Sequence, residues 1–244
     1  MTALSEESQD RPRARTDDAE VEAEARVTER IITFSDGVIA IAITLLALAL
    51  PIPDATHLTN VQLLQVIQTD WPDYFAFLLS FVVIGNQWAT HRRVCRYVDQ
   101  MTGWVGKLNM VWLLMMVLTP FAAKMLAGGG GSSASFGVRF AIYTLVQVIA
   151  EACLMLMSRE AQLRHMLRSD APESARRPDS IPYLAVIITL LVSIPVAFAV
   201  GGFAFMVWIA ISLTSRGLRL LMAHGRHATG DGAPGSRPFS GRNR

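Results

Sequence analysis

Long apolar stretches dominate this 244-residue chain and constrain its fold more than any other feature. A helix needs roughly 20 residues, at about 1.5 Å each, to cross the hydrocarbon core of a bilayer. The composition is 52% hydrophobic and only 17% charged, whereas soluble domains are about 25% charged. The sequence therefore predicts an all-α, polytopic membrane protein with six transmembrane helices per subunit, over about residues 30–50, 73–89, 104–126, 137–157, 181–200 and 202–222.

The two ends of the chain differ from this apolar region. Residues 1–26 mix Asp and Glu with Arg and contain almost no large apolar side chains, and residues 223–244 are rich in Gly, Arg, Pro and Ser. Such segments bury too little apolar surface to offset the entropy of ordering. We therefore expect a disordered acidic tail over 1–26, a six-span domain over 27–222 and a disordered C-terminal tail over 223–244.

The positions of the cations predict the orientation. Lys and Arg are retained on the cytoplasmic side of membrane proteins. If the N-terminus is cytoplasmic, all of the 22 Lys and Arg residues except Lys124 and Arg139 lie in cytoplasmic segments. This asymmetry predicts cytoplasmic N- and C-termini and supports the count of six spans. Lys124 and Arg139 flank the external glycine-rich loop, and we expect their side chains to extend to the membrane interface.

Two acidic residues lie within the predicted spans beyond the first residue of each span. A carboxylate in a span costs several kcal/mol unless it is paired or reaches water, so each is a candidate functional residue. Asp36 lies at the cytoplasmic end of the first span, where it could also be shallow enough to reach headgroup water or cap the helix. Glu151, in the fourth span, could bind a coupling proton or be hydrogen-bonded to Gln147 one turn away.

The start of the first span carries a recognisable motif. Arg30-x-x-x-Phe34-Ser35-Asp36 is followed by Gly-Val-Ile-Ala-Ile-Ala-Ile-Thr-Leu-Leu and by a terminal proline. This pattern resembles the first helix of the TMEM175 family of potassium channels, in its bacterial single-repeat form. Further agreement comes from Trp88 and His91 at the end of the second span, Leu108-Asn109 at the start of the third, and Pro120-Phe121 near its end. The resemblance covers about residues 27–126 well, and the rest through span count and topology.

The resemblance implies a homotetramer in which the first helices surround a central pore lined by hydrophobic side chains. The family's constricting isoleucine falls on Ile41, and further pore-facing layers fall on Leu45 and Leu48. These three positions share one narrow helical stripe, at 100° per residue. Periodicity alone does not select this stripe, because another is formed by Val38, Ala42 and Leu46.

The resemblance also implies roles for the polar residues. It places a threonine, here Thr44, close to the filter; this hydroxyl either bonds to a neighbouring helix or bonds back to its own backbone. It joins the cytoplasmic ends of the helices through the motif and polar residues of the second and third spans. Here these residues are Arg30, Phe34, Ser35, Asp36, Trp88, His91 and Asn109, which makes Asp36 structural.

These features together predict a potassium-selective, leak-type cation channel in the cell (plasma) membrane, with lipid and potassium ions as its partners. The scattered histidines, the two cysteines without CxxC spacing and the lack of a phosphate-binding glycine loop predict neither an enzyme nor a metal or cofactor site. The tails lack interleaved aromatics, so no nucleic-acid binding is expected. Two alternatives stay open: a proton-coupled secondary transporter using Asp36 and Glu151, and a membrane scaffold without transport.

Overall fold

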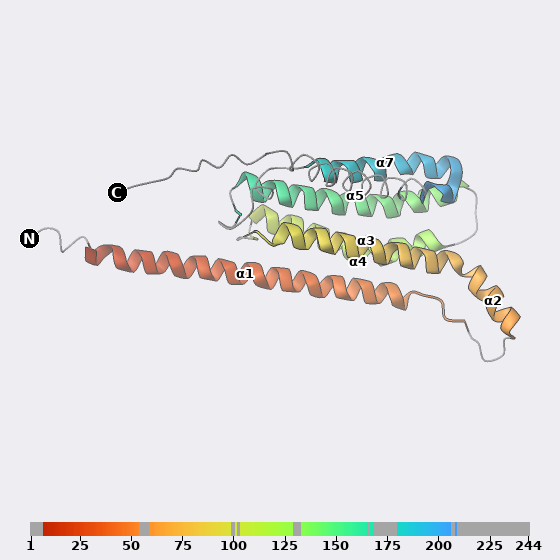
Figure 1. The fold of residues 1–244 in the computed structure, drawn as a ribbon, viewed down its shortest axis with the longest axis horizontal. Helices are drawn as coiled ribbons and strands as arrows, with labels where there is room; N and C mark the ends of the chain where they lie inside the picture. The colour runs from red at the N-terminus through yellow and green to blue at the C-terminus, as the bar shows by residue number, and fades with distance from the viewer. Residues whose placement is uncertain are drawn as a thin grey trace, which may run out of the picture.

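The computed structural model describes residues 7–53, 59–98, 101, 103–128, 133–164, 166–167, 180–205 and 208, and side chains from residue 22 onward. Apart from one isolated β-bridge between Val98 and Leu167, the regular structure in these ranges is helical. The helices are α1 (Glu7–Leu48), α2 (Asn60–Thr69), α3 (Trp71–Cys95), α4 (Gly103–Ala127), α5 (Ser133–Leu163) and α7 (Ile181–Val200), followed by the 3₁₀ turn η2 (Gly201–Phe203) (Figure 1). The predicted all-α fold is confirmed.

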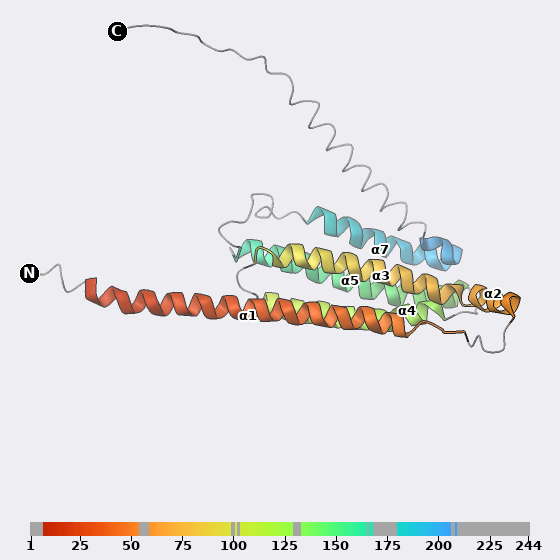
Figure 2. The same cartoon turned by 60° about the horizontal axis from the view of Figure 1, so that its bottom comes forward.

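The long helices lie side by side in a bundle, with α1 at its edge (Figures 1 and 2). Helix α5 packs against α4 and α7, while α3 packs against α4 and α5. Helix α1 packs against α3 and α4 and leaves its remaining surface uncovered within the protomer. The short helix α2 lies at the end of the bundle to which the C-terminal end of α1 points (Figure 1).

Four segments are long and apolar enough to cross a bilayer: Glu22–Leu48, Gly103–Ala127, Ala134–Leu163 and Ile181–Phe203. They coincide with the first, third, fourth and fifth predicted spans. Helix α3 contains the second predicted span and runs alongside the others, but Asn86, Gln87 and His91 make its C-terminal half more polar. The sixth predicted span, 202–222, lies mostly outside the described residues, as does the tail 223–244.

Helix α1 is longer than the sequence analysis predicted. It begins at Glu7 and spans 42 residues, so it includes most of the segment 1–26 that we expected to be disordered. Figures 1 and 2 show this first part of the helix extending beyond the bundle. Hydropathy arguments overlook the fact that Glu, Arg and Ala are strong helix formers. An ion pair four residues apart also favours the helix: Arg26 Nη2 lies 3.9 Å from Glu22 Oε2.

The core contains large side chains from every long helix of the bundle. Trp112 of α4 and Tyr143 and Phe140 of α5 are completely buried. Phe140 also contacts Phe205 and Trp208, with ring centroids 5.2 and 5.3 Å away. These contacts anchor the chain that follows η2 to α5. Apolar packing thus holds α4, α5 and α7 together and leaves α1 as the peripheral helix.

Gly137 permits the close approach of α5 and α7 and yields a test of this packing. A Cβ atom at Gly137 would lie 2.6 Å from Cδ1 of Phe198 on α7. We expect Gly137→Ala to lower the midpoint of thermal unfolding in detergent, because overpacking costs about 1–3 kcal/mol. Gly85 on α3 is the matched control, since a Cβ there meets no atom within 4 Å. Gly85→Ala should leave the midpoint unchanged or raise it, and equal losses in both variants would contradict the packing we describe.

Candidate pore helix and the polar network behind it

Helix α1 buries one narrow stripe against the bundle. Its buried residues from the motif onward are Ser35, Ile39, Ala42 and Leu46, spaced three or four residues apart. Such spacing places side chains on one face of a helix. The stripe of Val38, Ala42 and Leu46, which periodicity alone could not reject as pore-lining, therefore packs mainly against other helices of the same protomer, because Val38 also contacts the core.

The stripe that contains the predicted constriction is exposed in the protomer. The exposed fractions are 59% for Ile41, 45% for Leu45 and 81% for Leu48. Phe34, two turns before Ile41, lies on the same stripe and is 56% exposed. Arg30 is exposed as well, one turn before Phe34. The free face of α1 therefore begins with a cation and continues with large apolar side chains.

A second row of exposed residues on α1 consists of small side chains. It contains Gly37, Ala40, Thr44 and Ala47, which neighbour the Ile41 stripe. The Thr44 hydroxyl donates a 2.8 Å hydrogen bond to the carbonyl oxygen of Ile41. Within the protomer this hydroxyl is thus satisfied by its own helix, which is one of the two interpretations given above.

A directed chain of buried hydrogen bonds joins α1 to α4 and α3. Asn109 Nδ2 donates to Ser35 Oγ at 3.0 Å, and Ser35 Oγ donates to the carbonyl oxygen of Ile31 at 2.8 Å. Asn109 Oδ1 lies 2.8 Å from His91 Nε2, which donates because an amide oxygen only accepts. All three side chains are completely buried. The structure therefore brings together one residue from each of the three helices that the motif was expected to join.

The same polar cluster continues into the bundle. The His91 ring stacks on Trp112, with centroids 4.1 Å apart and planes within 2°. Trp112 Nε1 donates to Gln87 Oε1 at 3.2 Å, and Gln87 Nε2 donates to Glu151 Oε2 at 3.1 Å. Gln87 is therefore the partner of Glu151, and the suggested bond to Gln147 is not formed, since Gln147 donates to Thr119 Oγ1 at 3.2 Å. A glutamine inside an apolar span was the sequence signal for Gln87 that we did not use.

Asp36 has a different partner. Trp88 Nε1 on α3 donates to Asp36 Oδ1 at 2.8 Å, at the edge of the bundle. The guanidinium carbon of Arg92 lies 5.0 Å from the centre of the Trp88 ring, which places a cation next to this pair. Arg30 forms no ion pair with Asp36 among the residues that the structure describes. The motif aspartate is thus held by an indole donor from another helix.

These contacts hold α1 against α3 and α4 and do not resemble a reactive centre. In the described ranges, no three His, Cys, Asp or Glu residues gather where they could bind a metal ion. The buried hydrogen bonds connect side chains of α1, α3, α4 and α5, and such connected networks favour a single packing arrangement, although His91 Nδ1 is buried without a partner among the described residues. What the site offers is a rigidly held helix whose free face is hydrophobic.

Comparisons with known proteins agree with this arrangement. A family described as the endosomal/lysosomal potassium channel TMEM175 matches residues 30–120. A potassium channel of Streptomyces collinus is 33% identical over 181 residues, which cover 71% of this chain and 87% of that protein. A potassium channel of Chamaesiphon minutus is 39% identical over 100 residues, 41% of this chain and 49% of that protein.

A solved structure is also similar. The crystal structure of a lysosomal potassium-selective channel TMEM175 homologue from Chamaesiphon minutus superposes with a TM-score of 0.62 at 26% identity. The match covers 78% of this chain and 98% of the other. The motif in α1, the polar contacts behind it and the extent of these matches lead to one conclusion: this multi-pass membrane protein is not an enzyme and belongs to the TMEM175 family of potassium channels.

Proposed function

We propose that this chain forms a homotetrameric, potassium-selective leak channel whose central pore is lined by four copies of α1. The observation that carries this proposal is the exposure of Ile41, Leu45 and Leu48 on a helix whose other stripe is fixed against α3 and α4. The buried stripe packs against helices of the same protomer. The exposed stripe is free to face a central axis, with Ile41 as the constriction and Leu45 and Leu48 as further rings.

The small residues on α1 support close contact between copies of the helix. Helices in a membrane associate where Gly, Ala, Ser or Thr lets the backbones approach. Gly37, Ala40, Thr44 and Ala47 form such a row beside the Ile41 stripe, and all are exposed in the protomer. In the proposed tetramer this row faces a neighbouring subunit and brings Thr44 close to the constriction.

A ring of isoleucine or leucine side chains offers no oxygen ligands to an ion. The ion must therefore cross hydrated or partly hydrated, and the ring acts as a barrier to wetting and to dehydration. Potassium loses water more readily than sodium, so such a barrier favours potassium. The sequence has no TVGYG-like carbonyl filter. The proposal thus derives selectivity from dehydration and predicts a weaker preference than a carbonyl filter would give.

The proposed orientation places the N-terminus in the cytoplasm. The Asp36–Trp88 pair then lies at the inner mouth of the pore, and Pro51 lies near the outer mouth. The distribution of Lys and Arg supports this orientation. Relatives among the bacterial potassium channels support a position in the cell (plasma) membrane. In this arrangement Arg30, Phe34, Ser35, Asp36, Trp88, His91 and Asn109 act as structural contacts at the inner end of the subunit.

Membership of a channel family favours a channel over the proton-coupled transporter. Flux through liposomes distinguishes them directly. A channel gives passive potassium flux without a proton gradient, whereas a coupled transporter requires that gradient or creates one.

Substitution of Ile41 tests the proposed constriction. We expect Ile41→Asn to raise potassium flux through purified protein in liposomes and to lower the potassium-to-sodium flux ratio, because a polar ring stays wetted and lowers the dehydration barrier. Ile188→Asn on α7 is the matched control, since Ile188 is 57% exposed and receives the same substitution. Unchanged flux ratios in Ile41→Asn, or equal changes in both variants, would remove α1 from the pore.

A second prediction concerns assembly. Light scattering in detergent should give a protein mass four times the 26.8 kDa of one chain. Leu48→Cys should form intersubunit disulfides on oxidation, because the proposed pore brings copies of this residue near one axis. Leu78→Cys, at an exposed position of α3, should not. The native Cys95 and Cys153 are buried, so they leave the assay undisturbed. A dimeric mass would refute the tetramer.

A further inference from the structure

The end of α1 creates an unpaired carbonyl. In a helix, each carbonyl oxygen accepts a hydrogen bond from the N–H four residues later, and proline has no N–H. Pro51 and Pro53 therefore remove the usual donors to Ala47 and Ala49. The N–H of Leu50 turns back to the Ala47 oxygen at 3.2 Å, which leaves the Ala49 oxygen to find a partner outside the helix.

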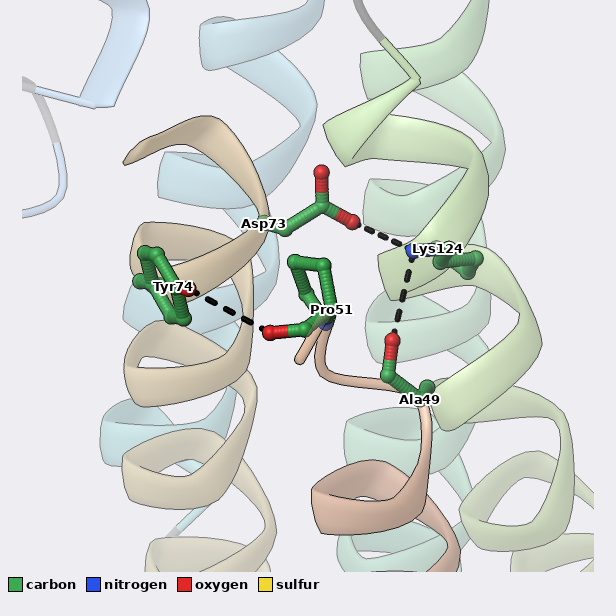
Figure 3. A network of polar contacts seen from close by, with 5 residues as sticks. All are labelled: Ala49, Pro51, Asp73, Tyr74 and Lys124. Carbon is green, nitrogen blue, oxygen red and sulfur yellow. Dashed lines mark hydrogen bonds and ion pairs between the residues drawn. The ribbon is translucent and has the colours of Figure 1, made fainter. Parts of the chain in front are cut away.

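Lys124 supplies that partner. Its Nζ donates to the Ala49 oxygen at 3.2 Å and lies 2.5 Å from Asp73 Oδ1 (Figure 3). Lys124 belongs to the last turn of α4 and Asp73 to the first turn of α3. Beside them, the Tyr74 hydroxyl donates to the Pro51 oxygen at 3.3 Å. The ends of three helices meet here, and Lys124 contacts two of them, whereas from the sequence we expected only that its side chain extends to the membrane interface.

The charges at this junction match the ends of the helices that carry them. A carboxylate is favourable at a helix N-terminus, which is where Asp73 lies, and a cation is favourable at a C-terminus, which is where Lys124 lies. The ammonium group also contacts the carbonyl oxygen of Ala49, the residue that directly follows α1. The Asp73 side chain is 22% exposed and the Lys124 side chain 53%, so the pair is shielded from water on the carboxylate side only. The junction therefore has a defined geometry and is more than a chance surface pair.

We propose that Lys124 and Asp73 are positioning residues of the pore, which hold the outer end of α1 through the Ala49 carbonyl. The proposal rests on the proposed function, because it requires α1 to line the pore. Leu48, the most exposed residue of the stripe, directly precedes Ala49 and is the last residue of α1. Leu46 is the last buried residue of α1, so a clamp on the Ala49 carbonyl adds a second fixed point immediately after Leu48 and helps to set its distance from the axis.

Two substitutions that remove opposite charges test this inference. Lys124→Met removes the donor, and Asp73→Asn leaves the donor without its anchor. If the pair positions Leu48, both variants should lower the potassium-to-sodium flux ratio in liposomes. If the two charges only attract or repel cations at the outer mouth of the pore, the variants should change total flux in opposite directions and leave the potassium-to-sodium flux ratio unchanged. That result would overturn the proposal.

Matched controls separate positioning from net charge. Asp70→Asn makes the same change of charge three residues before Asp73, at a side chain that forms no cap hydrogen bond. Lys107→Met removes a positive charge, as Lys124→Met does, but at the opposite end of α4. Both controls should keep the wild-type ratio. Lys124→Arg retains the charge and the donors and should restore most of it. The double variant Asp73→Asn/Lys124→Met should equal the single variants, because both remove one contact.

The Ile41→Asn variant, measured in parallel, distinguishes the two proposals. If Ile41→Asn lowers the ratio while Lys124→Met and Asp73→Asn do not, the clamp is wrong and the pore helix stands. If none of the three changes it, the assignment of α1 to the pore is wrong. Wild-type elution and helicity must be kept for a variant to count, and Lys124→Arg provides a folded comparison at the same position.

Discussion

The arrangement of this subunit depends on Asn109, whose buried amide joins Ser35 of α1 to His91 of α3. Helices in lipid gain little from burying apolar surface against each other, because the lipid is equally apolar. Their relative rotation therefore depends on close packing and on the few polar groups that must be paired. Asn109 has a donor and an acceptor directed at two different helices, so a rotation of α1 that moved Ser35 away would leave buried polar atoms unpaired. This constraint decides which stripe of α1 is left exposed.

Helix α1 is held by polar contacts at both ends of its membrane-spanning part and by small apolar contacts between them. Ser35 and Asp36 bind to Asn109 and Trp88 near its start, and the Ala49 carbonyl binds to Lys124 near its end. Between these points, Ile39, Ala42 and Leu46 fill the contact with α3 and α4. Ile41, the proposed constriction, lies within this doubly fixed segment. A hydrophobic constriction needs such rigidity, because its barrier to ion dehydration depends on the width of the ring and no bound oxygen ligands help to hold that width.

The sequence was most informative where chemistry is unusual and least informative where geometry decides. Ser35, His91 and Asn109 could be grouped in advance because the motif implied it, and their contacts are found. Periodicity could not distinguish the stripe of Ile41 from that of Ala42, since both are apolar; in the folded protomer the first is exposed and the second is buried. Gln87 was missed although a glutamine inside an apolar span is itself a signal, and the partners of Gln87 and Trp112 lie on other helices, so local spacing could not identify them. The long N-terminal part of α1 was missed because low hydropathy says nothing about helix propensity.

Adjacent residues on α3 explain why the two acids of the spans have separate environments. Gln87 and Trp88 point about 100° apart on their helix. Gln87 therefore reaches Glu151 inside the bundle, while Trp88 reaches Asp36 at its edge. A transporter that used both acids for one coupled cycle would need them to share an ion or proton, yet Trp112, His91 and Asn109 stand between Glu151 and α1 in the chain of contacts. These side chains are completely buried, so the contacts between Glu151 and α1 serve to pack the helices together. Such packing suits the fixed wall of a channel better than the alternating-access site of a transporter.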